Sequence, residues 1–530
     1  MMKTTAIILC FLWVGIFNLQ AQTKADATSA IGKQEYRKAI DILTSFLAQN
    51  PKDGEGYYLL GTAYFENEDL TNAQSTFNRG ITAQPKYGLN FAGLGRVLQQ
   101  SDNTEEAKKN FQKALDLTQS NNVEVLTQVA DGYLAMDTKE SLADAEKLLI
   151  KAKTLDSKNV FVYTSLGDLY LKRKIDELAL NNYRKAIELD KTFLRGYLRV
   201  GQLYIKDKKY NEGAQALREA LQVDPEFAPA YRELGELYYR AGKYEDAKNN
   251  YKKYVELTGN DLIARARYAG FLYLTDDFEA SLAEINTVMK DTSTLVLLRI
   301  KGYCLLKIGN YAESKSVLDA YFKVIKPKDI IADDYEIYAK TLEKLGDDST
   351  AIEYYYKAIE KDATKATLLN DIAQNYTRQK KYDQSVGVYK KIVETNPSFK
   401  NYYDLGKAYY SLKDYENARV MFDQMKVSEP EVYLGYFWAG NALAQTEDME
   451  NPEGKAKADY EKTIELISAS GKTDRYKNDF IASNSYLAYL YYSKEDFENA
   501  YKHCEAVLSI EAEHPQCKPL MEFLAKNKKP

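Results

Sequence analysis

The stretch Tyr231–Leu257, "YRELGELYYRAGKYEDAKNNYKKYVEL", carries two runs of small and apolar residues at helical spacing. Its first half follows the i, i+3, i+4, i+7 spacing of one helix face, with Tyr231, Leu234, Gly235 and Tyr238. Its second half repeats a helical spacing, with Ala247, Tyr251 and Tyr254. Gly242 between them suits the position just after a helix end, because glycine adopts left-handed backbone angles at little cost. The stretch therefore predicts two amphipathic helices joined by a tight turn.

The same pattern recurs on the N-terminal side of this stretch. Gly167, Gly201 and Gly235 lie 34 residues apart, and Gly61 and Gly95 show the same step. Other residues keep this step as well: Tyr170, Tyr204 and Tyr238; Ala186 and Ala220; Ala73 and Ala107; Phe77 and Phe111. A fixed period of this length predicts stacked helical hairpins.

These residues resemble the tetratricopeptide repeat (TPR), whose pattern combines aromatic-x2-L-G-x2-Y with later small and aromatic residues and a proline. The unit "YYLLGTAYFENEDLTNAQSTFNRGITAQP" supplies Tyr57, Leu60, Gly61, Tyr64, Ala73, Phe77, Gly80 and Pro85. The resemblance implies an all-α, right-handed α-solenoid of about fourteen hairpins from residue 22 to 514. A capping helix is expected near 516–526, within a C-terminal segment of residues 515–530.

Repeat packing accounts for most of the 45 tyrosines. A hairpin cannot bury its apolar face alone, so its stability comes from stacking on its neighbours. Gly or Ala lets the two helices of a hairpin approach, and Tyr or Phe fills the space between hairpins. The insertion "KPKDIIADD" at 326–334 interrupts the period. We therefore expect two arrays, 22–328 and 329–514, which are continuous or weakly hinged near 326–331.

The N-terminus has the layout of a secretory signal peptide over residues 1–21. "MMKTTAIILCFLWVGIFNLQAQ" contains one lysine, an apolar run and a polar segment ending in Ala21. Its "LQAQ" ending resembles signal peptides of Bacteroidota, a group of bacteria. The run is shorter than the roughly 20 residues of a membrane span, and no later segment is apolar enough for one. We expect a mature chain starting near Gln22, without a transmembrane segment, that is periplasmic, extracellular or associated with the cell envelope.

Charge and motif content exclude several function classes. The chain has 72 basic and 77 acidic residues and a net charge of -5, whereas a general nucleic-acid binder needs a dominant basic surface. It has two histidines, both near the C-terminus, and lacks the motifs G-x-S-x-G, H-E-x-x-H and G-x-G-x-x-G. We expect no nucleic-acid partner, no catalytic residues and no cofactor.

The C-terminal segment "HCEAVLSIEAEHPQC" gathers both histidines and two cysteines: His503, Cys504, His514 and Cys517. These residues lack a recognised zinc spacing, and adjacent helical residues point about 100° apart. A disulfide between Cys504 and Cys517 is favoured over a metal site, because an exported protein meets oxidants. We therefore expect no metal.

The resemblance implies where a partner would bind. In TPR proteins the first helix of each hairpin lines a concave groove, and residues not used in stacking face the ligand. At these positions lies an arginine–tyrosine stripe: Arg195, Arg199, Arg232, Tyr239, Arg240, Arg267, Tyr273, Arg299 and Tyr303. Arginine binds carboxylates bidentately, so the stripe predicts an acidic peptide or other anionic ligand. The alternative is pairing along one helix, as between Arg232 and Glu236.

A second candidate surface is a C-terminal aromatic patch: Phe437, Trp438, Asn441, Tyr486, Tyr489 and Tyr492. Aromatic anchors are enriched at interface hot spots, although a lengthened repeat needs the same residues for its core.

The sequence thus predicts an exported, non-enzymatic scaffold for protein or peptide partners in or near the cell envelope. Two alternatives stay open. One is a polysaccharide-binding or exopolysaccharide-export accessory protein, because tyrosines can stack on sugars. The other is an enzyme that uses carboxylates in an inserted loop. The fold alone does not select among them.

Overall fold

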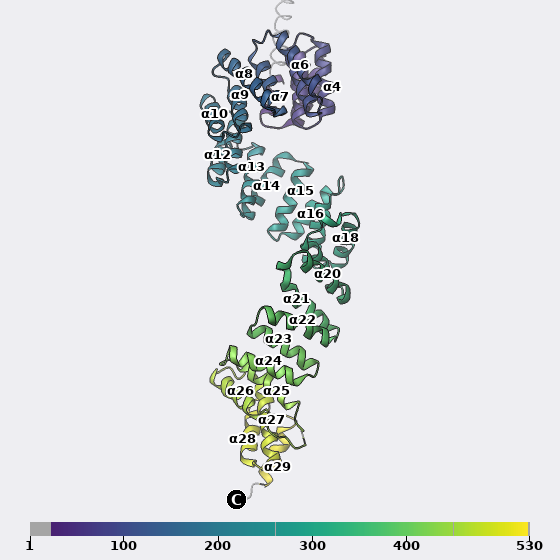
Figure 1. Cartoon of the computed structure of the whole chain (residues 1–530), viewed down its shortest axis with the longest axis vertical. Coiled ribbons are helices and arrows are strands. Elements are labelled where there is room, and N and C mark those ends of the chain that lie inside the picture. The colour runs from purple at the N-terminus through teal and green to yellow at the C-terminus, as the bar shows by residue number, and fades with distance from the viewer. Residues whose placement is uncertain (1–22, 260, 449, 528–530) are drawn as a thin grey trace, which may run out of the picture. The chain divides into compact units, whose positions relative to one another are not determined.

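The described part of the chain consists of helices that are joined, for the most part, by short turns (Figure 1). The structure is a computed structural model that describes residues 23–259, 261–448 and 450–527. None of the residues in these ranges belongs to a β-strand, so the all-α prediction is confirmed. The chain forms two compact units, Met1–Ser293 and Thr294–Pro530.

The N-terminal unit begins with helical residues 23–32 and continues through fifteen labelled helices, of which each odd-numbered one packs on its even-numbered successor. These are α2 (Tyr36–Gln49), α3 (Gly54–Glu66), α4 (Leu70–Ala83), α5 (Gly88–Gln100), α6 (Thr104–Leu117), α7 (Val123–Met136), α8 (Lys139–Leu155), α9 (Val160–Lys172), α10 (Asp176–Leu189), α11 (Leu194–Lys206), α12 (Tyr210–Val223), α13 (Ala228–Arg240), α14 (Tyr244–Thr258), α15 (Leu262–Leu274) and α16 (Phe278–Val288).

The C-terminal unit continues the same pairing and adds two short 3-10 helices, η1 and η2. Its elements are α17 (Leu295–Lys307), α18 (Tyr311–Val324), η1 (Pro327–Asp329), α19 (Ala332–Lys344), α20 (Asp348–Lys361), η2 (Ala363–Leu368), α21 (Leu369–Arg378), α22 (Tyr382–Thr395), α23 (Phe399–Ser411), α24 (Tyr415–Ser428), α25 (Tyr433–Ala444), α26 (Lys457–Ala469), α27 (Lys477–Ser493), α28 (Phe497–Leu508) and α29 (Cys517–Asn527).

The predicted succession of helical hairpins is confirmed. The stretch Tyr231–Leu257 folds as α13 and α14, and Gly242 in the turn between them has φ +72°. Helix α29 occupies the position predicted for the capping helix. Equivalent turns also use residues other than glycine, such as Lys174 (φ 61°) and Lys208 (φ 59°), so the turn does not require glycine.

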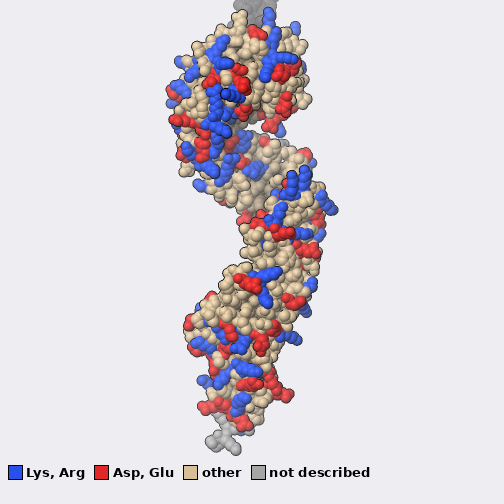
Figure 2. Space-filling view, viewed as in Figure 1, with Lys and Arg blue, Asp and Glu red and all other residues tan. Residues whose placement is uncertain are grey.

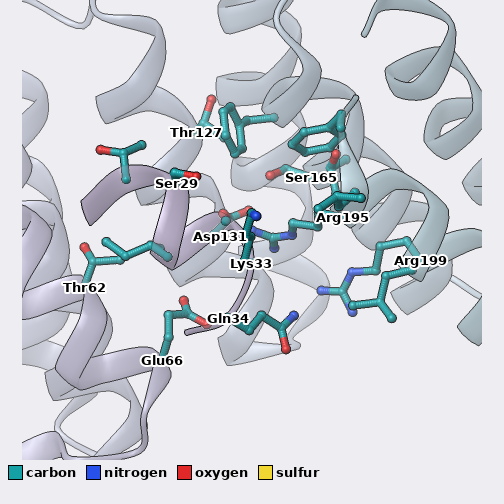
Figure 3. Close-up of a pocket in the computed structure, with 18 of the residues that line it drawn as sticks. Ser29, Lys33, Gln34, Thr62, Glu66, Thr127, Asp131, Ser165, Arg195 and Arg199 are labelled. Carbon is teal, nitrogen blue, oxygen red and sulfur yellow. The ribbon is translucent and has the colours of Figure 1, made fainter. Parts of the chain in front are cut away.

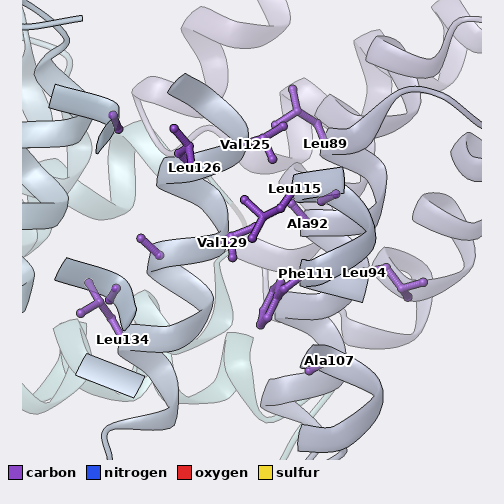
Figure 4. Packing of buried hydrophobic residues seen from close by; sticks show 14 of the residues in the cluster. Leu89, Ala92, Leu94, Ala107, Phe111, Leu115, Val125, Leu126, Val129 and Leu134 are labelled. Carbon is purple, nitrogen blue, oxygen red and sulfur yellow. The ribbon is translucent and has the colours of Figure 1, made fainter. Parts of the chain in front are cut away.

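Aromatic residues of the second helices fill the space beside small residues of the first helices. Phe111 on α6 is fully buried (Figure 4). A Cβ atom added to Gly95 on α5 would lie 2.4 Å from the Phe111 ring, and one added to Gly132 on α7 would lie 2.2 Å from it. One ring therefore joins its own hairpin to the next, and glycine is needed on both sides of it.

The division into units falls between Ser293 and Thr294, before the insertion at 326–334. The hinge expected near 326–331 stays a prediction. The expected signal peptide, residues 1–21, lies outside the described residues. Within the ranges that the structure covers, no helix is long and apolar enough to cross a membrane.

Candidate functional site

The N-terminal unit holds a cavity of about 990 Å³ (Figure 3). Most of its wall comes from the first helices of six successive hairpins, namely residues 23–32, α3, α5, α7, α9 and α11. The first helices of these six hairpins therefore line the cavity. We call this space the N-terminal cavity.

Arg96 on α5 is held in the cavity wall by three neighbours. Its guanidinium donates to Gln128 Oε1 at 2.7 Å and to Glu66 Oε1 at 3.0 Å, and it lies 4.5 Å from the centroid of the Phe65 ring. Burial alone would lower the pKa of Arg96, but the carboxylates of Glu66 and Asp131 outweigh burial and raise it. The positive charge of Arg96 is thus held in place and balanced by neighbouring carboxylates.

Arg195 and Arg199, two residues of the predicted stripe, both lie in this wall and face Asp168. Arg199 pairs with Asp168 at 3.1 Å, whereas Arg195 lies 3.9 Å from it. Asp168 also accepts a 2.6 Å hydrogen bond from the hydroxyl of Tyr183 on α10. Arg195 is therefore the less tightly paired of the two arginines.

Five acidic residues line the cavity, none of which the sequence analysis identified, and Glu124 and Asp131 on α7 are two of them. Burial raises the pKa of Glu124, although a hydrogen bond from Tyr58 acts to lower it. Burial also raises the pKa of Asp131, although Arg96, Arg195 and a hydrogen bond from Ser165 each act to lower it. The cavity wall consequently carries charge of both signs and is not a basic groove.

A salt bridge between Lys33 and Asp224 connects the first hairpin to the end of α12 across the cavity wall, at 2.8 Å. The hydrogen bond to Asp224 raises the pKa of Lys33. Burial alone would raise the pKa of Asp224, but bonds from Lys33 and from the backbone of Glu226 lower it. Residues far apart in sequence thus meet at this edge of the cavity.

A regular contact links neighbouring first helices, and we call it the inner ladder. Each first helix carries the Gly or Ala of the repeat pattern, such as Gly201 or Gly235. The residue directly after this Gly or Ala contacts the residue that lies two positions before the corresponding Gly or Ala of the next first helix. The contacts are Arg96–Gln128 at 2.7 Å, Asp168–Arg199 at 3.1 Å, Gln202–Glu233 at 3.0 Å, Glu236–Arg267 at 2.8 Å and, in the C-terminal unit, Lys407–Trp438 at 3.3 Å to the ring centroid.

The ladder explains the part of the stripe that follows α11. Arg232 pairs with Glu233 at 3.1 Å, not with Glu236 as one-turn spacing suggested. Glu236 is instead bound by Arg267, which also stacks over the Tyr239 ring, 4.9 Å from its centroid. The remaining two residues of the stripe in this unit, Arg240 (exposed) and Tyr273 (half-buried), lie on α13 and α15.

Arg299 and Tyr303 belong to the C-terminal unit and converge on Asp334, which is fully buried. Arg299 Nε lies 2.8 Å from an Asp334 oxygen, and the Tyr303 hydroxyl donates to Asp334 at 2.7 Å. Asp334 also accepts from the backbone N–H of Ile331 at 3.0 Å. These two stripe residues therefore fix the insertion at 326–334 to α17, and the stripe does not form one site.

The C-terminal aromatic patch is also divided. Phe437 is buried, Asn441 accepts a 2.8 Å bond from Tyr460, and Tyr486 donates to Glu447 at 2.8 Å. Tyr492 packs on Phe497 and Phe523, whereas Tyr489 is exposed. Trp438 is half-buried among Tyr403, Tyr410, Phe422 and Phe437.

Cys504 and Cys517 are buried in one cluster with their thiols hydrogen-bonded to each other, and they are not joined by a disulfide. The bond with Cys504 lowers the pKa of Cys517. His514 Nδ1 accepts the Cys517 backbone N–H at 3.3 Å, whereas His503 stacks on Tyr491. Among the described residues, no group of three or more His, Cys, Asp or Glu side chains could hold a metal ion. Cys304 is a buried core residue.

Five segments match family models for the tetratricopeptide repeat: residues 25–87, 91–121, 204–261, 335–364 and 399–424. These segments are tetratricopeptide repeats. The TPR prediction is therefore confirmed for parts of both units.

The chain is also similar to mitochondrial import receptor subunit TOM70 of rat, human and mouse. The identity is 28% over 138 residues, which are 26% of this chain and 22% of each relative. The chain thus matches less than a quarter of the length of these relatives.

Two solved structures are similar in part. One is the C-terminal part of a TPR repeat-containing protein from Cytophaga hutchinsonii, with 26% identity and a TM-score of 0.44, covering 48% of this chain and 99% of that one. The other is PilF of Pseudomonas aeruginosa, with 20% identity and a TM-score of 0.29, covering 41% of this chain and 97% of that one.

Proposed function

We propose that this protein is a non-enzymatic scaffold that binds a polypeptide segment of a partner protein in its N-terminal cavity. The observation that carries the proposal is the cavity itself, about 990 Å³ in volume and lined by the first helices of six TPR hairpins. The matched relatives are receptor subunits, which agrees with a binding role.

The wall chemistry suits a peptide. Charges of both signs face the space, and threonine and serine hydroxyls lie between them at Thr62, Thr127 and Ser165. Phe161, which is 53% exposed, lines the same cavity and offers an apolar contact. A peptide presents backbone hydrogen-bonding groups and side chains of mixed character, so it complements such a wall better than a uniformly charged polymer does.

We further propose that the protein acts outside the cytoplasm, in or near the cell envelope of a bacterium. The layout of residues 1–21 supports this location. The alternative partner is a polysaccharide, which exposed tyrosines could stack on.

The test is photo-crosslinking in the native host with a photoreactive residue at Phe161. The matched control is Ile150 on the second helix α8, which is 55% exposed and does not line the cavity. We expect protease-sensitive adducts at position 161, few at position 150, and fewer at 161 when Arg195→Glu is added. Equal capture at both positions would contradict the cavity site, and adducts removed by glycan digestion would favour the polysaccharide.

A further inference from the structure

A half-buried lysine in the C-terminal unit lacks an acidic partner. Lys407 on α23 occupies the ladder position that Asp168, Gln202 and Glu236 occupy in the N-terminal unit. In those hairpins the opposite residue is polar or charged, whereas Lys407 faces Trp438 on α25.

Aromatic rings surround the Lys407 ammonium group. Nζ lies 3.3 Å from the centroid of the Trp438 ring and 5.8 Å from that of Tyr410. Tyr410 and Tyr403 in turn pack against Trp438, with centroids 5.5 Å and 6.3 Å from it. An ammonium over such a ring is attracted by the ring quadrupole, but the contact does not neutralise its charge.

No carboxylate lies within 4.0 Å of the Lys407 ammonium group among the described residues, and the group lies over the rings of Tyr410 and Trp438. The two carboxylates that raise the pKa of Tyr403 are engaged elsewhere, Asp404 with Lys400 at 2.6 Å and Asp479 with the Tyr433 hydroxyl at 2.9 Å. Burial lowers the pKa of Lys407, with nothing opposing it.

The equivalent lysine of an earlier hairpin shows the contrast. Lys340 on α19 also follows the small residue of its first helix, and it pairs with Glu336 at 2.5 Å. Lys407 has no such neighbour. A carboxylate supplied by a binding partner would therefore offset the free-energy cost of partly burying an unpaired ammonium group.

We propose that Lys407, Tyr403, Tyr410 and Trp438 form a binding site for an aspartate or glutamate side chain of an acidic segment of a partner protein. The ammonium pairs with the carboxylate, and the rings exclude water around the pair. A single ammonium balances the single charge of a carboxylate, whereas a phosphate group carries about 1.5–2 negative charges at pH 7. That the partner is a protein rests on the proposed function, but the site lies in the other unit from the N-terminal cavity.

Trp438 reports on this site directly. The chain has two tryptophans, Trp13 and Trp438, so the full-length Trp13→Phe protein carries Trp438 alone. The probe is poly-L-glutamate at an ionic strength of about 0.05 M. We expect a saturable change in Trp438 emission that weakens at about 0.5 M salt, because exposed charge is screened. Lys407→Met should weaken binding about tenfold or more. Lys407→Arg, which keeps the charge and stacks on rings, should retain it.

The matched control is Lys340→Met, which removes a paired lysine and should leave poly-L-glutamate binding unchanged. Circular dichroism of each variant checks that the variant is folded. Absence of a response in the parent protein, or an equal response in Lys407→Met, would overturn the proposal. An equal Lys407-dependent response to dextran sulfate would overturn the assignment to carboxylates. None of these outcomes affects crosslinking at Phe161, so the two proposals fail separately.

Discussion

Glu236 accepts two hydrogen bonds from Arg267, one from Nε and one from Nη2, each at 2.8 Å. The two residues belong to successive hairpins. Glu236 also accepts from the Tyr251 hydroxyl of its own hairpin at 2.8 Å. One carboxylate on α13 therefore links α13 to α14, the second helix of its hairpin, and to α15, the first helix of the next hairpin.

The first prediction concerns this pair. Arg267 is 42% exposed, so a double-mutant cycle of Glu236→Gln and Arg267→Met should give a coupling of about 0.5–1 kcal/mol, the upper range for exposed pairs. Hydrogen exchange of α13 to α15 measures it locally, because a repeat array need not unfold in one step. A coupling of zero would show that the bidentate geometry adds no stability.

The same pair predicts a pH dependence. Burial alone would raise the pKa of Glu236, but bonds from Arg267 and Tyr251 outweigh it and the pKa is lowered. A carboxyl with a depressed folded-state pKa adds stability above its unfolded value of about 4.3 and loses it as pH falls through the folded value. The coupling should persist at pH 7 and weaken as the pH falls below the unfolded value of about 4.3 and through the folded value. Coupling that grows on acidification would contradict this sign.

The second prediction compares two helical glycines. A Cβ atom on Gly235 would lie 2.3 Å from the Tyr251 ring, so Gly235→Ala should destabilise its hairpin by about 1–3 kcal/mol. Gly387 on α22 has no atom within 4 Å of such a Cβ, so Gly387→Ala should stabilise its helix by up to about 1 kcal/mol. Hydrogen exchange of each hairpin measures whether the substitution stabilises or destabilises it. Destabilisation at both positions would contradict the prediction.

The third prediction concerns the capping helix. Cys504 and Cys517 already touch, so oxidation should join them and hold α29 on the last hairpin, with a stabilisation of about 2–4 kcal/mol. Thiol counting on denatured protein purified from the envelope should then find Cys304 alone among residues 22–530. Three reactive thiols would show that the pair stays reduced.

The fourth prediction concerns the N-terminus. Export with cleavage after Ala21 should give a chain that starts at or near Gln22. N-terminal sequencing and intact mass of the protein from its native host measure this. Soluble protein that still carries Met1 would refute it.

The fifth prediction concerns the two units. A fragment ending at Ser293 should keep its helicity, because contacts in repeat arrays are mostly between neighbours. Circular dichroism of the fragment tests it. Complete loss of helicity would mean that the units depend on each other for folding.

Sequence periodicity revealed the fold because packing repeats with the period. Gly235 and Tyr251 stand at fixed steps, and the structure places them in contact. The stripe was harder to interpret, because helical spacing relates Arg232 to Glu236, whereas the contact that forms relates Glu236 to Arg267 in the next hairpin. A comparison of residues 31 positions apart would have found that pair and also Lys407 with Trp438.

The N-terminal cavity could not be predicted in this way. Its edge joins Lys33 to Asp224, and that contact depends on how hairpin-to-hairpin rotations accumulate over six repeats. Glu124 and Asp131 were missed for a similar reason, because nothing in their local spacing distinguishes them from solvated acids.

The Lys33–Asp224 bridge has a kinetic consequence for the N-terminal unit. A linear array folds by local steps, each closing a short loop, and its folding rate reflects low contact order. The bridge closes a loop that spans six hairpins, and its entropic cost can be met only after the intervening hairpins are in place. The bridge should therefore form late and open early, so the first and sixth hairpins should separate from each other before any single hairpin unfolds.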